Sequence, residues 1–279
     1  MRPNCAFAYY NLEMSELDSK ANARQLFILL PSAVEPPSNM PFLALRDPSV
    51  RFKQTLKALR YWSKFQNLDG FNVKVVIGDN TGWSNRLFQS ARKGYRDGNL
   101  IFVEIPRPSD EVILRGKGAA ETEALIFMLN QVQIPQEAFV IKMTARQYCV
   151  NAADLLARIP ATANFAAWPR PFLDSIDSRF FIGRAAFLRE VLPIIANGTD
   201  DMSGAYVENL YAQICIWDNR QRFVRLDHEP GILGQAGTTG TQLSILSESV
   251  LIGYFVVFRN LLRTKFFWIQ PRYARKKSH

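Results

Sequence analysis

Short apolar runs alternate with helical patterns through most of this sequence, and this alternation restricts the fold more than any other feature. Four runs are short, nearly continuous and rich in branched apolar residues, which is typical of strands buried on both faces of a sheet. They cover residues 25–30, 72–77, 100–105 and 139–141. A helix-start signal follows the first run at Asp47-Pro48-Ser49, where a proline falls in the first turn. Strands separated by helices predict an α/β fold with a mostly parallel sheet.

The second half of the chain continues this pattern less regularly. We expect helices at residues 84–92, 116–131, 184–196 and 203–217, a short helix after Asn151, and strands at 164–168 and 222–226. Residues 227–241 show no regular periodicity. There is no internal repeat and no clear linker. We therefore divide the chain into an amino-terminal extension (1–24), one folded domain (25–241) and a carboxyl-terminal segment (242–279).

The charge balance favours an anionic partner. The chain has 34 Lys and Arg against 25 Asp and Glu, a net charge of +9. Much of the excess lies after Glu248, where seven basic residues follow and no acidic one does. The remainder is nearly neutral, which argues against a broad nucleic-acid surface, so we expect no nucleic-acid partner.

Cysteine usage indicates a reducing compartment, and hydropathy predicts neither a signal peptide nor a membrane-spanning helix. Cys5, Cys149 and Cys215 are odd in number and far apart, which predicts neither a disulfide framework nor a zinc site. The first residues lack the apolar core of a signal peptide, and no stretch reaches the ~18 apolar residues of a spanning helix. We expect a cytoplasmic protein.

Several common catalytic motifs are missing from the sequence. The first βα turn has no GxGxxG, and neither GxxxxGK[ST] nor GxSxG occurs. These gaps argue against dinucleotide-binding, P-loop and α/β-hydrolase chemistry.

Polar side chains follow three of the expected strands. Asp79 and Asn80 follow 72–77, Lys142 and Arg146 follow 139–141, and His228 follows the strand near 222–226. Because ligands of open α/β sheets bind at the carboxyl ends of strands, these residues are candidates for one site. Two cations at the end of a buried strand indicate an anionic ligand, although a solvated strand end with an incidental ion pair would give the same pattern.

The start of the helix at 116–131 is a second candidate for anion binding. Gly116-Lys117-Gly118 leaves backbone N–H groups open at the helix start, Lys117 adds charge, and Glu121 lies one turn in. The alternative is an ordinary capped helix whose glutamate complements the dipole.

Taken in chain order, these segments resemble a bacterial glycosyltransferase of the GT-A type. They are most similar to the divergent group of polysaccharide-assembly transferases that lack a DxD motif. The matching segments are Arg46-Asp47-Pro48 with Arg51, residues 75–82, 116–121, 141–146 and 177–180, Glu208, and the loop 234–240. The resemblance spans residues 25–241 and implies a GT-A-like (Rossmann-like), mostly parallel sheet flanked by helices.

The resemblance also implies roles for individual residues on the donor side. In GT-A enzymes the polar loop after an early strand holds the nucleotide base or ribose, which here are Asp79 and Asn80. The place of metal-binding carboxylates is taken by Lys142 and Arg146, so we expect a metal-independent reaction without a cofactor. The candidates for donor and phosphate binding are Asp79, Asn80, Lys117, Lys142, Arg146, Arg179 and His228. The donor would be a nucleotide sugar or another sugar diphosphate.

An inverting transferase also needs a carboxylate that accepts the proton of the acceptor hydroxyl. The resemblance places Glu208 in that role, with Asp177 and Glu121 as rivals, while each could equally be a helix-surface carboxylate or an ion-pair partner. Arg46 and Arg51 are candidates for acceptor binding or for a structural role. The acceptor would be a growing bacterial surface polysaccharide or a lipid-linked glycan.

The carboxyl-terminal stretch 251–279 mixes bulky apolar and aromatic residues with basic ones. This composition is typical of a segment in the interface of an anionic membrane, and it predicts a peripheral protein on the inner face of the cell membrane. A core-packing helix with a solvated basic end is the alternative. Two other functions remain open: a phosphoribosyl-type transferase that uses a sugar diphosphate, and a non-catalytic protein that docks on membrane or nucleic acid.

Overall fold

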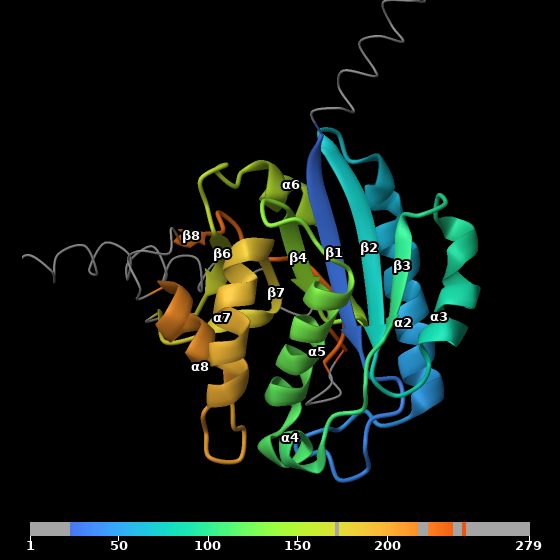
Figure 1. The fold of residues 1–279 in the computed structure, drawn as a ribbon, viewed down its shortest axis with the longest axis vertical. Coiled ribbons are helices and arrows are strands. Elements are labelled where there is room, and N and C mark those ends of the chain that lie inside the picture. The colour runs from blue at the N-terminus through green and yellow to red at the C-terminus, as the bar shows by residue number, and fades with distance from the viewer. Residues whose placement is uncertain (1–22, 171–172, 217–222, 237–241, 244–279) are drawn as a thin grey trace, which may run out of the picture.

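A computed structural model describes residues 23–170, 173–216, 223–236 and 242–243 of the chain. A seven-stranded sheet lies at its centre in the order β3-β2-β1-β4-β7-β6-β8, with helices on both faces (Figure 1). Its strands are β1 (Arg24–Ser32), β2 (Phe71–Asp79), β3 (Leu100–Glu104), β4 (Phe139–Met143), β6 (Phe165–Pro169), β7 (Ile176–Arg184) and β8 (Phe223–Arg225). A second, antiparallel sheet consists of β5 (Gln147–Cys149), β9 (Ile232–Gln235) and β10 (Gln242–Leu243).

Seven α-helices are found in the described residues. They are α2 (Pro48–Trp62), α3 (Ser84–Ala91), α4 (Asp110–Arg115), α5 (Lys117–Gln131), α6 (Ala152–Ala157), α7 (Ala185–Gly198) and α8 (Val207–Tyr211). Single turns of 3-10 helix follow α2 and α3, and a π-helical turn, Ala212–Ile216, follows α8.

The predicted α/β class with a mostly parallel sheet is confirmed. Strands β1, β2, β3 and β4 run parallel, and β7 is the one strand of this sheet that runs antiparallel to both of its neighbours. In the β1–β2 register Ser32 pairs with Asp79, so these two strands end at the same level. Their carboxyl ends meet at one edge, beside α4 and the start of α5 (Figure 1).

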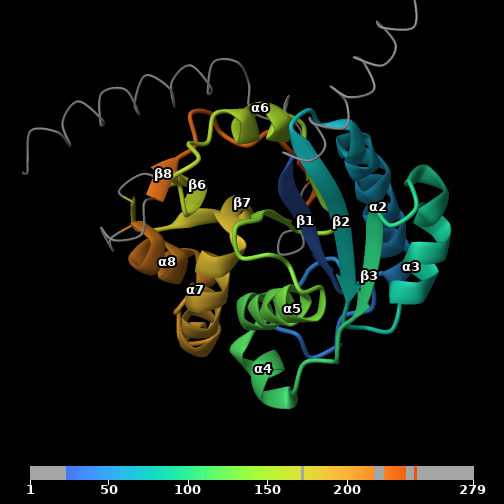
Figure 2. The same cartoon turned by 45° about the horizontal axis from the view of Figure 1, so that its top comes forward.

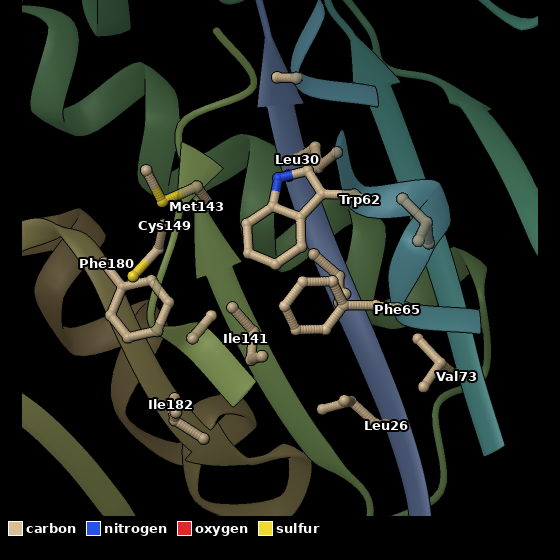
Figure 3. Close-up of a cluster of buried hydrophobic side chains, with 14 of the residues drawn as sticks. Leu26, Leu30, Trp62, Phe65, Val73, Ile141, Met143, Cys149, Phe180 and Ile182 are labelled. Carbon is tan, nitrogen blue, oxygen red and sulfur yellow. The ribbon is translucent and has the colours of Figure 1, made fainter. Parts of the chain in front are cut away.

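The two faces of the sheet carry separate apolar cores. On one face Trp62 and Phe65 pack against β1 and β4, where Leu26, Leu30 and Ile141 are fully buried (Figure 3). The helices α2, α3 and α6 cover this face, whereas α5, α7 and α8 cover the other (Figure 2). Both faces of the central strands are therefore buried against apolar side chains, which explains why the sequences of those strands are continuous apolar runs.

Local signals placed several elements correctly. The carboxylate of Asp47 accepts hydrogen bonds from the backbone N–H groups of Ser49 and Val50, and Pro48 opens α2 as expected. The first four strands and the helices α2, α3, α5 and α7 lie where they were predicted.

Other elements differ from the prediction. The helix expected from residue 203 begins at Val207, because residues 200–205 form a turn closed by the Asp200–Ala205 bridge. The sequence reading missed α4, β5 and β9, which are each six residues long or shorter. It also missed β7 as a strand, because Asp177-Ser178-Arg179 interrupts its apolar pattern.

The predicted amino-terminal extension and the basic tail fall almost entirely outside the described residues. Gln242 and Leu243 are the exception, since they form β10. No described helix combines the length and the apolar character needed to cross a bilayer.

Candidate active site

A pocket lies where β1, β4 and the start of α5 meet, at the carboxyl edge of the sheet. Much of its lining is apolar and comes from the end of β1 and the proline-rich loop after it. The apolar lining residues are Pro31, Ala33, Pro36, Pro37, Met40, Leu43, Ala120 and Ala236. The lining also contains four cations, Arg51, Lys117, Arg146 and Arg179, and one carboxylate, Glu121.

Arg51 and Arg146 are the two buried residues among these four cations, with 4% and 7% of their surface exposed. Arg51 Nε donates to the carbonyl oxygen of Ala33 at 2.6 Å, and its Nη1 donates to that of Leu45 at 2.9 Å. Neither arginine forms an ion pair with any described carboxylate. Burial and then the nearby Arg146 charge lower the pKa of Arg51 to about 9, so Arg51 is still a cation at neutral pH. Burial likewise lowers the pKa of Arg146.

The strand β9 holds Arg146 in place. The carbonyl oxygen of Gln235 accepts hydrogen bonds from Arg146 Nη1 at 3.4 Å and from Gln147 Nε2 at 3.2 Å. The approach requires glycine at position 234, where φ is +126° and a Cβ would lie 2.7 Å from the carbonyl oxygen of Arg146.

Lys142 has a different environment from the arginines. Its Nζ lies 3.0 Å from Glu121 Oε1 and donates to the carbonyl oxygen of Ser178 at 2.5 Å, and its side chain is 3% exposed. It does not line the pocket. The prediction that Lys142 binds donor phosphates is therefore corrected: the ion-pair alternative describes this residue.

Glu121 lines the pocket from α5, and its Oε1 also accepts a hydrogen bond from Thr144 Oγ1 at 3.0 Å. Burial opposes its ionisation, but the charges of Lys142 and Lys117, together with these hydrogen bonds, hold the pKa of Glu121 below its usual value. Glu121 is therefore an ionised partner of Lys142.

The start of α5 is not open to a phosphate. Asp201 Oδ2 accepts the backbone N–H of Gly118 at 3.1 Å, so an internal carboxylate occupies the anion position. Gly116 has φ +106°, and any Cβ there would collide with Asp201. The structure therefore favours the ordinary capped helix, although Lys117, Ala120 and Glu121 from α5 line the pocket.

Asp177 is bound to Arg179 through both carboxylate oxygens. Its Oδ1 accepts from Arg179 Nε at 2.8 Å and its Oδ2 from Nη2 at 2.5 Å. Burial raises the pKa of Asp177, but Arg179 outweighs it and the net shift is downward. The predicted base role of Asp177 is not supported, because its oxygens serve to orient Arg179 toward the pocket.

Glu208 stands in the first turn of α8 and is half-buried. Its Oε1 accepts a hydrogen bond from Ser178 Oγ at 2.7 Å, and its charge acts on Arg179. It lies beside the Arg179 end of the pocket rather than in the lining.

Asp79 and Asn80 have separate roles. The carboxylate of Asp79 is fully buried and accepts four hydrogen bonds, from the backbone N–H groups of Val34, Thr81 and Trp83 and from the hydroxyl of Thr81. These bonds hold Asp79 inside the protein and it does not line the pocket, so the structure does not support a base- or ribose-binding role for Asp79. Asn80 does line the pocket, and its Oδ1 is buried without a partner.

The remaining predicted residues lie at the periphery. Arg46 is exposed and donates to the carbonyl oxygens of Pro37, Ser38 and Met40. Its role is therefore structural, because these bonds fix the proline-rich loop that lines the pocket. His228 is exposed and does not line the pocket, which corrects its assignment to the donor site.

Sequence reasoning missed Gln147, Thr144 and Ala236 as pocket residues. Gln147 follows Arg146 directly, but nothing in a lone glutamine signals a ligand. The proline-rich loop after β1 was visible in the sequence, and its position after a central strand was the signal that could have identified it. Among the described residues no three His, Cys, Asp or Glu side chains gather as a metal site would require.

Comparison with known proteins adds no relative. The sequence matches no protein-family model, and no curated protein matches it.

Proposed function

We propose that this chain is a glycosyltransferase that moves a sugar from a diphosphate-linked donor to a hydroxyl group of a glycan. The observation that carries the proposal is the pocket lining, which contains Arg51, Lys117, Arg146 and Arg179 but only one carboxylate, Glu121. Asp177 pairs with Arg179, but no described ion pair neutralises Arg51 or Arg146, and two such charges fit a ligand with two negative charges.

The cost of burying the arginines supports an anionic ligand. A buried cation is expensive unless an opposite charge accompanies it closely. Neither Arg51 nor Arg146 forms an ion pair with a described carboxylate, and the charges of Asp79 and Glu121 act on them only from beyond ion-pair distance. One phosphate oxygen at ~4 Å from a guanidinium would contribute roughly 4 kcal/mol at an effective dielectric of 20, before desolvation. Two guanidiniums would therefore stabilise a departing diphosphate electrostatically, as preorganised groups in other active sites do.

The sheet supports the GT-A-like assignment. A crevice at the carboxyl ends of parallel strands is where α/β proteins bind ligands, and this pocket lies there. In the GT-A resemblance, metal-binding carboxylates would follow the fourth strand. Arg146 stands after β4, so a protein cation takes over charge neutralisation and the reaction proceeds without a divalent metal.

The reaction requires a base on the acceptor side. The acceptor oxygen bonds to the anomeric carbon while the bond from that carbon to the diphosphate oxygen breaks, and the acceptor proton passes to a carboxylate. Glu208 suits this role better than its rivals, because both oxygens of Asp177 bind Arg179 and Glu121 is paired with Lys142. The acceptor would enter at the Arg179 end and would belong to a surface polysaccharide or a lipid-linked glycan, with the protein peripheral to the membrane.

Ligand binding tests the donor part of this proposal. Calorimetric titration of the full-length protein with nucleoside diphosphates, sugar nucleotides and phosphoribosyl diphosphate, in Mg²⁺ and again in EDTA, should identify a diphosphate ligand whose affinity does not depend on Mg²⁺. Arg146→Ala should weaken it about 100-fold, since hydrogen bonds to charged groups are the strong ones. Arg158→Ala removes the same charge from an exposed pair outside the pocket and should change nothing. If the two variants bind alike, or no diphosphate binds, the transferase reading fails and the docking-protein reading gains.

Turnover tests the base. Glu208→Gln keeps the hydrogen bond from Ser178 but cannot take a proton, so turnover should fall about 100-fold while donor affinity is kept. Normal turnover in Glu208→Gln together with inactive Glu121→Gln would move the role to Glu121.

A further inference from the structure

Two residues that line the pocket each have a buried side-chain oxygen that accepts no hydrogen bond from the described residues. These oxygens are Oδ1 of Asn80, which follows β2, and Oε1 of Gln147, on β5. The two residues are 8% and 2% exposed, and both line the pocket together with Arg51 and Arg146. A buried acceptor without a donor costs free energy, so two of them in one pocket point to a ligand that supplies the donors.

The orientation of Gln147 is fixed by its neighbour. Its Nε2 donates to the carbonyl oxygen of Gln235 at 3.2 Å, and a carbonyl can only accept. Turning the amide round would set two oxygens against each other, so Oε1 is the atom left without a partner. The carboxamide of Asn80 makes no hydrogen bond to any described residue, while its backbone N–H is held by the carbonyl oxygen of Ser32 at 3.2 Å.

The chemistry of these atoms narrows the ligand. A carboxamide oxygen accepts hydrogen bonds and gives none, so its partner must be an O–H or N–H group. An ionised diphosphate offers no such group, and neither does a hydrocarbon chain. Hydroxyl groups on a sugar ring next to the diphosphate supply them.

The GT-A resemblance already implies that Asn80 contacts the nucleotide base or ribose. We propose that Gln147, together with Asn80, determines the specificity of the pocket by accepting hydrogen bonds from the hydroxyl groups of a sugar ring attached to the diphosphate. The arginines then bind any diphosphate, while the two carboxamides distinguish a glycosyl or nucleoside diphosphate from inorganic pyrophosphate and from diphosphates of hydrocarbon alcohols. This inference rests on the proposed function in one respect only, namely that the pocket binds a diphosphate.

Matched ligands test the proposal on the full-length protein. Uridine diphosphate and its 2′,3′-dideoxy analogue share base and phosphates and differ in two ring hydroxyls, while inorganic pyrophosphate and geranyl diphosphate carry no sugar. We expect uridine diphosphate to bind about tenfold more tightly than the dideoxy analogue, the effect of one or two hydrogen bonds. Gln147→Met and Asn80→Leu should each reduce that ratio severalfold and leave pyrophosphate affinity within about twofold.

A matched variant controls for the effect on β9. Gln54 Nε2 also binds Gln235, at 2.6 Å from its Oε1, and Gln54 Oε1 is also buried without a partner, but Gln54 does not line the pocket. Gln54→Met should therefore keep the full ratio. If Gln147→Met does not fold, Asn80→Leu decides alone, because Asn80 gives up no side-chain hydrogen bond.

The outcomes separate this inference from the proposed function. Equal binding of uridine diphosphate and its dideoxy analogue, or an unchanged ratio in both pocket variants, overturns the specificity role even when Arg146→Ala abolishes pyrophosphate binding. Absence of binding by every diphosphate overturns the proposed function, and this inference with it.

Discussion

The buried cations at the carboxyl edge of the sheet are of two kinds, which differ in their partners. Lys142 is 2% exposed and pairs with Glu121 at 3.0 Å, whereas Arg51 and Arg146, at 4% and 7%, bind only backbone carbonyls among the described residues. Burial alone therefore does not separate a structural cation from a ligand-binding one. The partner does: a cation paired inside the protein contributes to folding, and one left unpaired beside a pocket is available to a ligand.

Breaking the Lys142–Glu121 pair should have the largest effect on the free energy of unfolding. Lys142→Met leaves the carboxylate of Glu121 without its closest cation, and removal of one partner of a buried pair costs about 3–5 kcal/mol. Urea unfolding should report that loss in the free energy of unfolding. The double variant Lys142→Met with Glu121→Gln should recover most of it, and Arg158→Ala, in an exposed pair, should lose less than about 0.5 kcal/mol. A Lys142→Met protein as stable as the wild type would remove the distinction between the two groups.

Lowering the pH should weaken the Lys142–Glu121 pair gradually, and the resulting loss in the free energy of unfolding should be smaller. Because Lys142 and Lys117 hold the pKa of folded Glu121 below its usual value, the stabilisation is complete above ~4.3, the ordinary pKa of glutamate. It is lost as the pH falls from there through the lower pKa of the folded state. The free energy of unfolding, measured against pH, should fall less steeply in Glu121→Gln than in the wild type. Asp177 has the same sign of shift and should keep some slope in both proteins. Identical slopes would place the titration elsewhere.

Removing an unpaired cation should have the smallest effect on stability. Arg146→Met should change the free energy of unfolding by no more than about 1 kcal/mol, because burial already disfavours the Arg146 cation and its hydrogen bond to Gln235 is long at 3.4 Å. Thermal unfolding and pyrophosphate titration on the same sample would show stability kept and affinity lost. A loss of stability as large as that of Lys142→Met would make Arg146 a structural residue.

The sequence predicted those parts of the fold that depend on local signals. The apolar runs of β1 to β4 and the Asp47-Pro48 start of α2 are readable because their causes lie within a few residues. For the candidate site, the sequence predicted only the edge of the sheet at which it lies. Whether Lys142 or Arg146 was available to a ligand depended on which of them forms an ion pair with Glu121 from α5, and on β9 returning to Arg146. Neither contact leaves a mark in the sequence near β4.

The same contact between β9 and Arg146 has a consequence for how the protein is made. Domains fold as the ribosome delivers them, amino terminus first. When the chain has emerged only as far as α7, all four cations of the pocket have been synthesised. Gln235, which accepts a hydrogen bond from Arg146, and Ala236, which lines the pocket, have not. In the proposed function, capture of a diphosphate therefore requires a chain that has left the ribosome to residue 236 at least, and a fragment ending earlier would carry the charges without the complete pocket.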